Sequence, residues 1–146
     1  MKKKIFILIS CFLTIGFIIL TQSYKNKEEY KYIAVPQWAD SLKNPLKNNI
    51  EATSLGKKLY NNMCSICHGD KGKGDGVAGM ALAHKPTDLS SVKTQEKSDG
   101  AIYWMITNGN PPMPAYKNVL KENERWQLVN YLREIGKSNS SKKLKK

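Results

Sequence analysis

Acidic residues and cysteines are scarce in this chain of 146 residues. It carries 12 Asp and Glu residues against 24 Lys and Arg residues, which gives a formal net charge of +12. Its three cysteines are too few for the disulfide framework of a small secreted scaffold. A hydrophobic content of 40% is too high for a disordered chain and too low for a membrane protein with several spans. No internal repeat is visible, and the length fits one domain.

The excess of positive charge lies mostly near the two ends of the chain. Residues 51–137 contain 12 basic and 9 acidic residues, a net of +3. Residues 2–4 add +3, residues 24–50 add +2 and residues 142–146 add +4. Because the charge is not gathered in the central region, it does not favour nucleic-acid binding. The sequence predicts a mildly basic domain with basic ends and no nucleic-acid partner.

The N-terminus has the pattern of a targeting segment. Three lysines at residues 2–4 precede a largely apolar run of 16 residues, Ile5–Leu20, as in a signal peptide or an uncleaved anchor. Such a helix rises about 24 Å, somewhat short of a hydrocarbon core of about 30 Å. Residues 1–23 are therefore predicted to be a signal peptide or a membrane anchor, with the anchor favoured. The rest of the chain is then expected in the periplasm or on the outer face of the cytoplasmic membrane. Cys11 is interpreted as a small hydrophobe rather than a lipid-bearing residue.

Two polar segments flank the predicted central domain, residues 51–137. Residues 24–50 contain two prolines and no clean helical or strand period, which predicts a tether. Apolar residues such as Ile33 and Trp38 indicate that part of the tether lies along the domain surface. Residues 138–146 are predicted to form a disordered basic tail.

The sequence C-S-I-C-H at residues 64–68 is the most informative stretch of the chain. On a helical turn, Cys64, Cys67 and His68 stand at positions i, i+3 and i+4, on one face. Two thiols at this spacing can form thioethers with the two vinyl groups of one porphyrin, and the imidazole then lies under the iron as proximal ligand. A thioredoxin-like motif would follow a strand, and a zinc site would have only His84 as a fourth ligand. These alternatives are less favoured than one covalently bound haem c.

Around this motif, residues 51–137 resemble a class I (monohaem) cytochrome c of the small bacterial type. The resemblance implies an all-α fold in which three to four helices wrap around one covalently bound haem. A domain of this size has a marginal core. We therefore expect the apo form to be largely unfolded.

Three of the expected helices can be placed in the sequence. The first runs from about Ser54 to the motif, with Thr53 or Ser54 as N-cap. The middle helix has its body at 101–107, after a cap at Ser98 and Asp99 and before a stop at Asn108 and Gly109. The last runs over 122–135, with Gly136 as the residue after its end. The resemblance implies that the first and last helices cross, with an aromatic residue packing over a glycine.

The residues expected to pack fall on one stripe of each helix. The resemblance assigns the glycine of the crossing to Gly56 and its aromatic partner to Tyr131, with Tyr60 at the aromatic position before the motif. The other members are Leu55, Leu59, Ile102, Met105, Ile106, Leu128, Leu132 and Ile135, and Tyr103 and Trp104 lie beside the stripe of the middle helix.

The resemblance implies a distal methionine ligand in a proline-bearing loop. Met113 fits, because prolines at positions 111, 112 and 114 stiffen its loop. Met80 and Met105 are the competing methionines, and packing explains them better. His84 would give a bis-histidine haem, and an open iron site is a further alternative.

The loop after His68 contains four glycines within residues 69–76, which let the backbone fold tightly. It lacks the endings of a phosphate loop and the carboxylates of a calcium loop. In the family, a proline at the next position often offers a carbonyl to the proximal histidine, but this chain has Val77 there. The run Pro86–Leu89 resembles a loop beneath the haem.

The predicted function is one-electron transfer by a His/Met-ligated haem, without enzymatic activity. Expected partners are a quinol- or substrate-oxidising complex upstream and a terminal oxidase or reductase downstream, with membrane attachment through the N-terminal segment. Two alternatives remain: a haem-based gas sensor or ligand-binding module, and an electron-entry subunit of a larger oxidoreductase.

Overall fold

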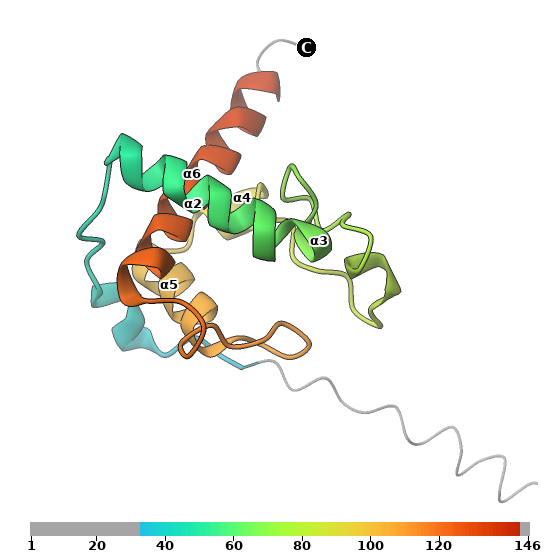
Figure 1. Ribbon diagram of the computed structural model, residues 1–146, viewed down its shortest axis with the longest axis horizontal. Coiled ribbons are helices and arrows are strands. Elements are labelled where there is room, and N and C mark those ends of the chain that lie inside the picture. The colour runs from blue at the N-terminus through green and yellow to red at the C-terminus, as the bar shows by residue number, and fades with distance from the viewer. Residues whose placement is uncertain (1–32, 144–146) are drawn as a thin grey trace, which may run out of the picture. The chain divides into compact units, whose positions relative to one another are not determined.

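The computed structural model describes residues 33–143, and within them the secondary structure is helical (Figure 1). In chain order the elements are η1 (Gln37–Ser41), α2 (Ile50–Met63), α3 (Ser65–His68), η2 (Gly79–Ala81), α4 (Val92–Gln95), α5 (Asp99–Asn108) and α6 (Glu122–Lys143). In this part of the chain, β-type pairing is confined to one isolated bridge between Asn110 and Met113. The predicted all-α fold is confirmed.

The predicted N-terminal signal or anchor, residues 1–23, lies outside the described residues. From residue 33 to residue 143, no helix is both long enough and apolar enough to cross a membrane.

Helices α2 and α6 cross at the centre of the structure (Figure 1). A Cβ atom on Gly56 of α2 would overlap the carbonyl oxygen of Gln127 and lie 3.1 Å from the backbone nitrogen of Leu128. One turn further along each helix, the rings of Tyr60 and Tyr131 pack with centroids 5.2 Å apart and planes tilted by 59°. The predicted crossing is present, but the atoms nearest Gly56 belong to the α6 backbone. The ring of Tyr131 packs against Tyr60, one turn from Gly56.

The core lies between α2, α5 and α6. Its buried members are Tyr60, Ile102, Ile106, Leu120, Trp126, Leu128, Val129, Leu132 and Ile135. The stripes predicted for the middle and last helices supply most of them, while Met105 and Tyr131 are partly buried at the edge of the core. Trp126 and Val129 widen the buried face of α6 beyond the predicted stripe.

The N-terminal ends of α2 and α5 follow from their N-caps. Helix α2 begins at Ile50 because the Asn49 side chain accepts a hydrogen bond from the backbone N–H of Ala52 at 2.8 Å. The predicted start near Ser54 is therefore wrong by one turn. Ser98 caps α5 as predicted, accepting from the backbone N–H of Ala101 at 3.0 Å.

Helix α6 continues to Lys143, past the end predicted at Gly136. Gly136 packs closely against Gln95, because a Cβ atom at this position would lie 2.5 Å from Oε1 of Gln95. The small residue thus makes room for Gln95 within the helix instead of ending it. The predicted disordered tail, residues 138–146, consequently begins inside α6, and residues 144–146 lie outside the described part of the chain.

Residues 33–49, which we call the strap, pack against the helices. Ala39 in η1 is fully buried, and Leu42 and Leu46 contact the core. Trp38 beside them is 59% exposed. This part of the predicted tether therefore lies along the domain, as predicted, but the contacts come from Ala39, Leu42 and Leu46. Ile33 and Trp38, whose apolar side chains suggested the packing, are both exposed. Residues 24–32 lie outside the described residues.

Candidate functional site

The C-x-x-C-H motif forms one helical turn that follows α2 directly. The backbone N–H of His68 donates to the carbonyl of Cys64 at 2.9 Å, and that of Cys67 donates to the same carbonyl at 3.1 Å. Cys64 has φ −112°, which separates α2 from the short helix α3. The two cysteines and the histidine therefore lie on one face of one turn, as their spacing predicts.

Both cysteines of the motif are free and half-buried. Burial, and next the charge of Cys67, raise the pKa of the Cys64 thiol to about 11. Cys64 is therefore a neutral thiol at physiological pH. Two half-buried thiols one turn apart are the donor set that two thioether bonds to one porphyrin require.

The imidazole of His68 is held by a backbone carbonyl. Its Nδ1–H donates to the carbonyl oxygen of Thr87 at 3.1 Å. Burial lowers the pKa of His68, although the hydrogen bond to Thr87 opposes this shift. A neutral imidazole with Nδ1 engaged leaves Nε2 as the ligand atom, a common arrangement for histidines that bind metal. The motif thus fits an axial ligand and two covalent attachment points for haem.

The carbonyl that holds His68 was not identified from the sequence. The position expected from the family, Val77, is 73% exposed and has no such role. The partner lies in the run Pro86–Leu89, which the sequence marks only weakly. A backbone carbonyl needs no particular side chain, so residue identity gives little signal for it.

The glycine-rich loop closes the end of α3. The backbone N–H groups of Gly74, Gly76 and Ala78 donate to the carbonyls of His68, Cys67 and Ile66 at 2.8, 3.2 and 2.9 Å, respectively. These are carbonyls that a helix end leaves without internal partners. The close return of the chain needs glycine, because a Cβ atom on Gly76 would lie 2.6 Å from the carbonyl oxygen of Ser65. The loop therefore fixes the turn that carries the ligands.

Tyr60 joins α2 to the same loop. Its hydroxyl donates to the carbonyl of Gly69 at 2.6 Å, in a buried position. Burial, then the charge of Cys64, raise the pKa of Tyr60 far above its ordinary value. Tyr60 thus positions the residue directly after His68.

Met113 lies in a tight loop after α5. Asn110 and Met113 exchange two backbone hydrogen bonds, of 3.0 Å and 2.9 Å, which close the four-residue turn. Further along, the backbone N–H groups of Tyr116 and Lys117 donate to carbonyls in the last turn of α5, at 3.1 Å each. The side chain of Met113 is half-buried.

Two side chains that the sequence did not single out connect this loop to the rest of the site. The Tyr116 hydroxyl donates to the carbonyl of Met63 at 3.4 Å, directly before Cys64. The pKa of Tyr116 is raised by burial and then by the charges of Cys64 and Cys67. Arg125 of α6 donates to the carbonyl of Leu120 at 2.7 Å, at the end of the loop. The loop that carries Met113 is therefore tied to the haem motif and to α6.

The other predicted candidates lie in different settings. Met80 is 69% exposed in η2, and Met105 is a partly buried residue on α5 beside the core. His84 is exposed in the loop between η2 and α4.

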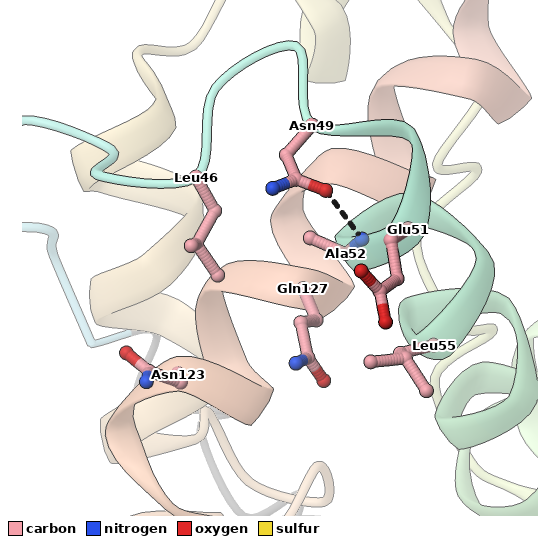
Figure 2. Close-up of a pocket in the computed structure, with 7 residues that line it drawn as sticks. All are labelled: Leu46, Asn49, Glu51, Ala52, Leu55, Asn123 and Gln127. Carbon is pink, nitrogen blue, oxygen red and sulfur yellow. Dashed lines mark hydrogen bonds between the residues drawn. The ribbon is translucent and has the colours of Figure 1, made fainter.

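A small pocket lies apart from this site, between the end of the strap and the first turns of α2 and α6 (Figure 2). Asn49, the N-cap of α2, lines it together with Leu46, Leu55 and Gln127. None of the residues of the C-x-x-C-H motif lines it. It has no part in the chemistry of the motif.

Comparison with known proteins agrees with the chemistry of the site. The family model described as cytochrome C oxidase, cbb3-type, subunit III, matches residues 51–132. The chain is 36% identical to cytochrome c6 of Anabaena variabilis over 85 residues, which cover 58% of this chain and 91% of that relative. It is 32% identical to cytochrome c6 of Euglena viridis over 82 residues, or 53% of this chain and 85% of the relative.

A solved structure of a reducing HAO-like protein complex from Kuenenia stuttgartiensis is also similar. The match has a TM-score of 0.57 and 26% sequence identity, and it covers 78% of this chain. It covers 54% of the other chain, so the present chain spans about half the length of that structure.

Proposed function

The chain belongs to the c-type cytochrome family that the matched model describes, and on this premise we propose that it carries single electrons outside the cytoplasm with a haem held by His68 and Met113. Its domain is a monohaem class I cytochrome c, and its cofactor is covalently bound haem c. When bound, the haem supplies an iron that alternates between the ferric and ferrous states. The observation that carries the assignment is the His68 imidazole fixed by Thr87 on the same turn as two free cysteines.

Each residue of the motif has a separate task in the proposal. Cys64 and Cys67 attach the porphyrin covalently, and His68 binds the iron through Nε2. The hydrogen bond from Nδ1–H to Thr87 fixes the tautomer and the orientation of the ring. The glycine-rich loop holds the turn in place, so that the ligand does not move when the iron changes its charge.

Met113 is the distal ligand in this proposal. Its support is the closed turn from Asn110 to Met113 and the tie from Tyr116 to the residue before Cys64. A soft thioether favours ferrous iron and thereby raises the reduction potential. A carrier benefits from a rigid loop here, because the same sulfur must bind the iron in both oxidation states.

An apolar surface beside the motif supports docking to redox partners. Ile66, Val77 and Met80 are 57%, 73% and 69% exposed, and backbone hydrogen bonds link their segments. Lys71, Lys73 and Lys85 lie on the loops that border them. We infer transient, salt-sensitive docking to an acidic surface on an upstream quinol- or substrate-oxidising complex and on a downstream terminal oxidase or reductase.

The N-terminal sequence supports the location. In this proposal, the N-terminal segment directs export of the domain across the cytoplasmic membrane and then anchors it there. The segment consists of the lysines at residues 2–4 and the apolar run Ile5–Leu20. Alkaline extraction of membranes from the native host tests the anchor. Retention of the full-length protein in the pellet is expected, and quantitative release would contradict it.

A second candidate function is supported by the comparisons. The matched family is described as a subunit of an oxidase, and the similar solved structure is part of a protein complex. The chain would then be the electron-entry subunit of a larger oxidoreductase. Stoichiometric co-purification with such a complex at moderate salt would favour this function over that of a free carrier.

Spectra of the oxidised and reduced holoprotein test the proposed ligands. The wild-type protein should show the weak ferric Met–iron charge-transfer band and should bind carbon monoxide poorly when reduced. Met113→Ala should lose the band, lower the reduction potential and bind carbon monoxide, whereas Met80→Ala should behave as wild type. A high-spin wild-type iron that binds carbon monoxide readily would instead assign the protein to the sensor class.

A further inference from the structure

The strap, residues 33–49, lies entirely before the segment that the family model matches, which begins at residue 51. Its central part binds the start of α5. A Cβ atom on Gly100 would overlap the carbonyl oxygen of the fully buried Ala39, so the two backbones touch. Asp40 accepts a hydrogen bond from the hydroxyl of Ser98, the N-cap of α5.

The last part of the strap is fastened to α5 and α6 by Asn44. The Asn44 amide donates to Asp99 of α5 at 3.1 Å and to the Asn130 side chain of α6 at 2.8 Å. Asn130 in turn donates to the carbonyl of Leu46 at 2.6 Å. These hydrogen bonds link the strap to both α5 and α6 and so fix the course of the strap over the two helices.

The first part of the strap extends beyond the other end of α5. There the backbone N–H of Ile33 donates to Oδ1 of Asn110 at 2.8 Å. Asn110 is also the residue whose backbone exchanges two hydrogen bonds with Met113. One residue therefore connects the strap through its side chain and the turn of Met113 through its backbone.

We propose that the strap positions the Met113 loop through the Ile33–Asn110 hydrogen bond, an inference that rests on Met113 as the distal ligand in the proposed function. The strap is held at the start of α5 and cannot follow the loop outward. When the loop moves away, the hydrogen bond to Ile33 breaks. The strap thus favours the closed position of the loop, and Asn110 is a positioning residue.

Imidazole binding to the oxidised, full-length holoprotein tests this proposal. Imidazole reaches the iron only when the loop is open, so its apparent affinity reports the open fraction. Ile33→Pro removes the donor, whereas the matched control Ile33→Ala keeps the backbone N–H. Ile33→Pro should bind imidazole about two- to tenfold more tightly than Ile33→Ala, as expected for the net contribution of one hydrogen bond.

A second pair of variants decides the question if Ile33→Pro does not fold. Asn110→Ala removes the acceptor and should raise imidazole affinity by a similar factor, whereas Asn110→Asp retains an acceptor oxygen and should restore the wild-type value. Val129→Ala, at a fully buried core position of α6, measures general destabilisation. It should lower the midpoint of urea unfolding and leave imidazole affinity within about twofold of wild type, because it removes no hydrogen bond of the strap or of the Met113 turn.

The outcomes distinguish an error in the ligation by Met113 from an error in the role of the strap. If the wild-type protein lacks the Met–iron charge-transfer band, the ligation by Met113 is wrong and the strap proposal falls with it. If the band is present but the Ile33 and Asn110 variants all bind imidazole like wild type, the strap proposal alone is overturned. An equal increase in Val129→Ala would also overturn it, because the effect would then come from general stability.

Discussion

The carbonyl group of Gln127 occupies the space that a side chain on Gly56 would need. Gly56→Ala must therefore push α2 and α6 apart, because the atoms in the way are backbone atoms that cannot rotate aside. We expect the free energy of unfolding of the holoprotein to fall by about 3 kcal/mol or more. Urea unfolding measures this change in free energy, and a substitution at the adjacent exposed residue Lys57 is the control. Lys57→Ala should change stability by less than about 0.5 kcal/mol, and a similarly small effect of Gly56→Ala would contradict the close crossing.

Arg133 and Lys137 of α6 each form an ion pair, and the two ion pairs differ in burial. Arg133 binds Asp99 at 2.7 Å with both side chains about a fifth exposed, and it also donates to backbone carbonyls within residues 95–97. Lys137 binds Glu134 at 2.6 Å in a much more exposed position. Arg133→Ala should cost about 2 kcal/mol, because it leaves partly buried acceptors without a partner. Lys137→Ala should cost less than about 0.5 kcal/mol. Equal losses in urea unfolding would show that burial does not distinguish the two pairs.

The stability of the protein should fall at alkaline pH in a way that depends on Tyr60. Burial raises the pKa of Tyr60 in the folded state, so above the ordinary pKa of about 10 the unfolded chain releases a proton that the folded protein retains. Unfolding is therefore favoured as the pH rises through this range. Between pH 9 and pH 11.5, the urea midpoint of unfolding should therefore fall less steeply with pH in Tyr60→Phe than in the wild-type protein. An unchanged slope in that variant would assign the effect to other groups.

Loss of the covalent haem should unfold most of the domain. In the double variant Cys64→Ser/Cys67→Ser, neither thioether can form, and the apolar surface that haem would cover is left to a small core. We expect haem staining of denaturing gels to disappear and far-UV circular dichroism to lose most of its helical signal. Ser65→Ala, within the same motif, should retain both signals. A fully helical double variant would mean that the protein core folds without the haem.

Features encoded by neighbouring residues were predictable from the sequence. The N-cap Ser98 and the buried stripe of α5 were predicted because a cap and a helical period are local patterns. The start of α2 was missed by a turn, since Ile50 is 86% exposed and does not extend the apolar period. Glycine is a common residue just after a helix end, but Gly136 lies within α6 and makes room for the side chain of Gln95 in α4.

Features that depend on distant contacts were not predictable. Asn44 and Asn130 are 86 residues apart in the sequence, and nothing near either one indicates their pairing. Thr87 acts through its carbonyl, a group that every residue has. The ligand assignments of Cys64, Cys67, His68 and Met113 stay predictions. The variants at Cys64, Cys67 and Met113 test three of them.

The strap also has a practical consequence for recombinant work. A fragment cut at the boundaries of the matched family segment, residues 51 and 132, would remove Leu42 and Leu46 from the face of the core that they contact. It would also end before Arg133 and Ile135, which fasten α6 to its neighbours. Apolar surface would then be exposed at both cut ends, which promotes aggregation. An expression fragment should therefore begin no later than residue 33 and extend beyond Gly136.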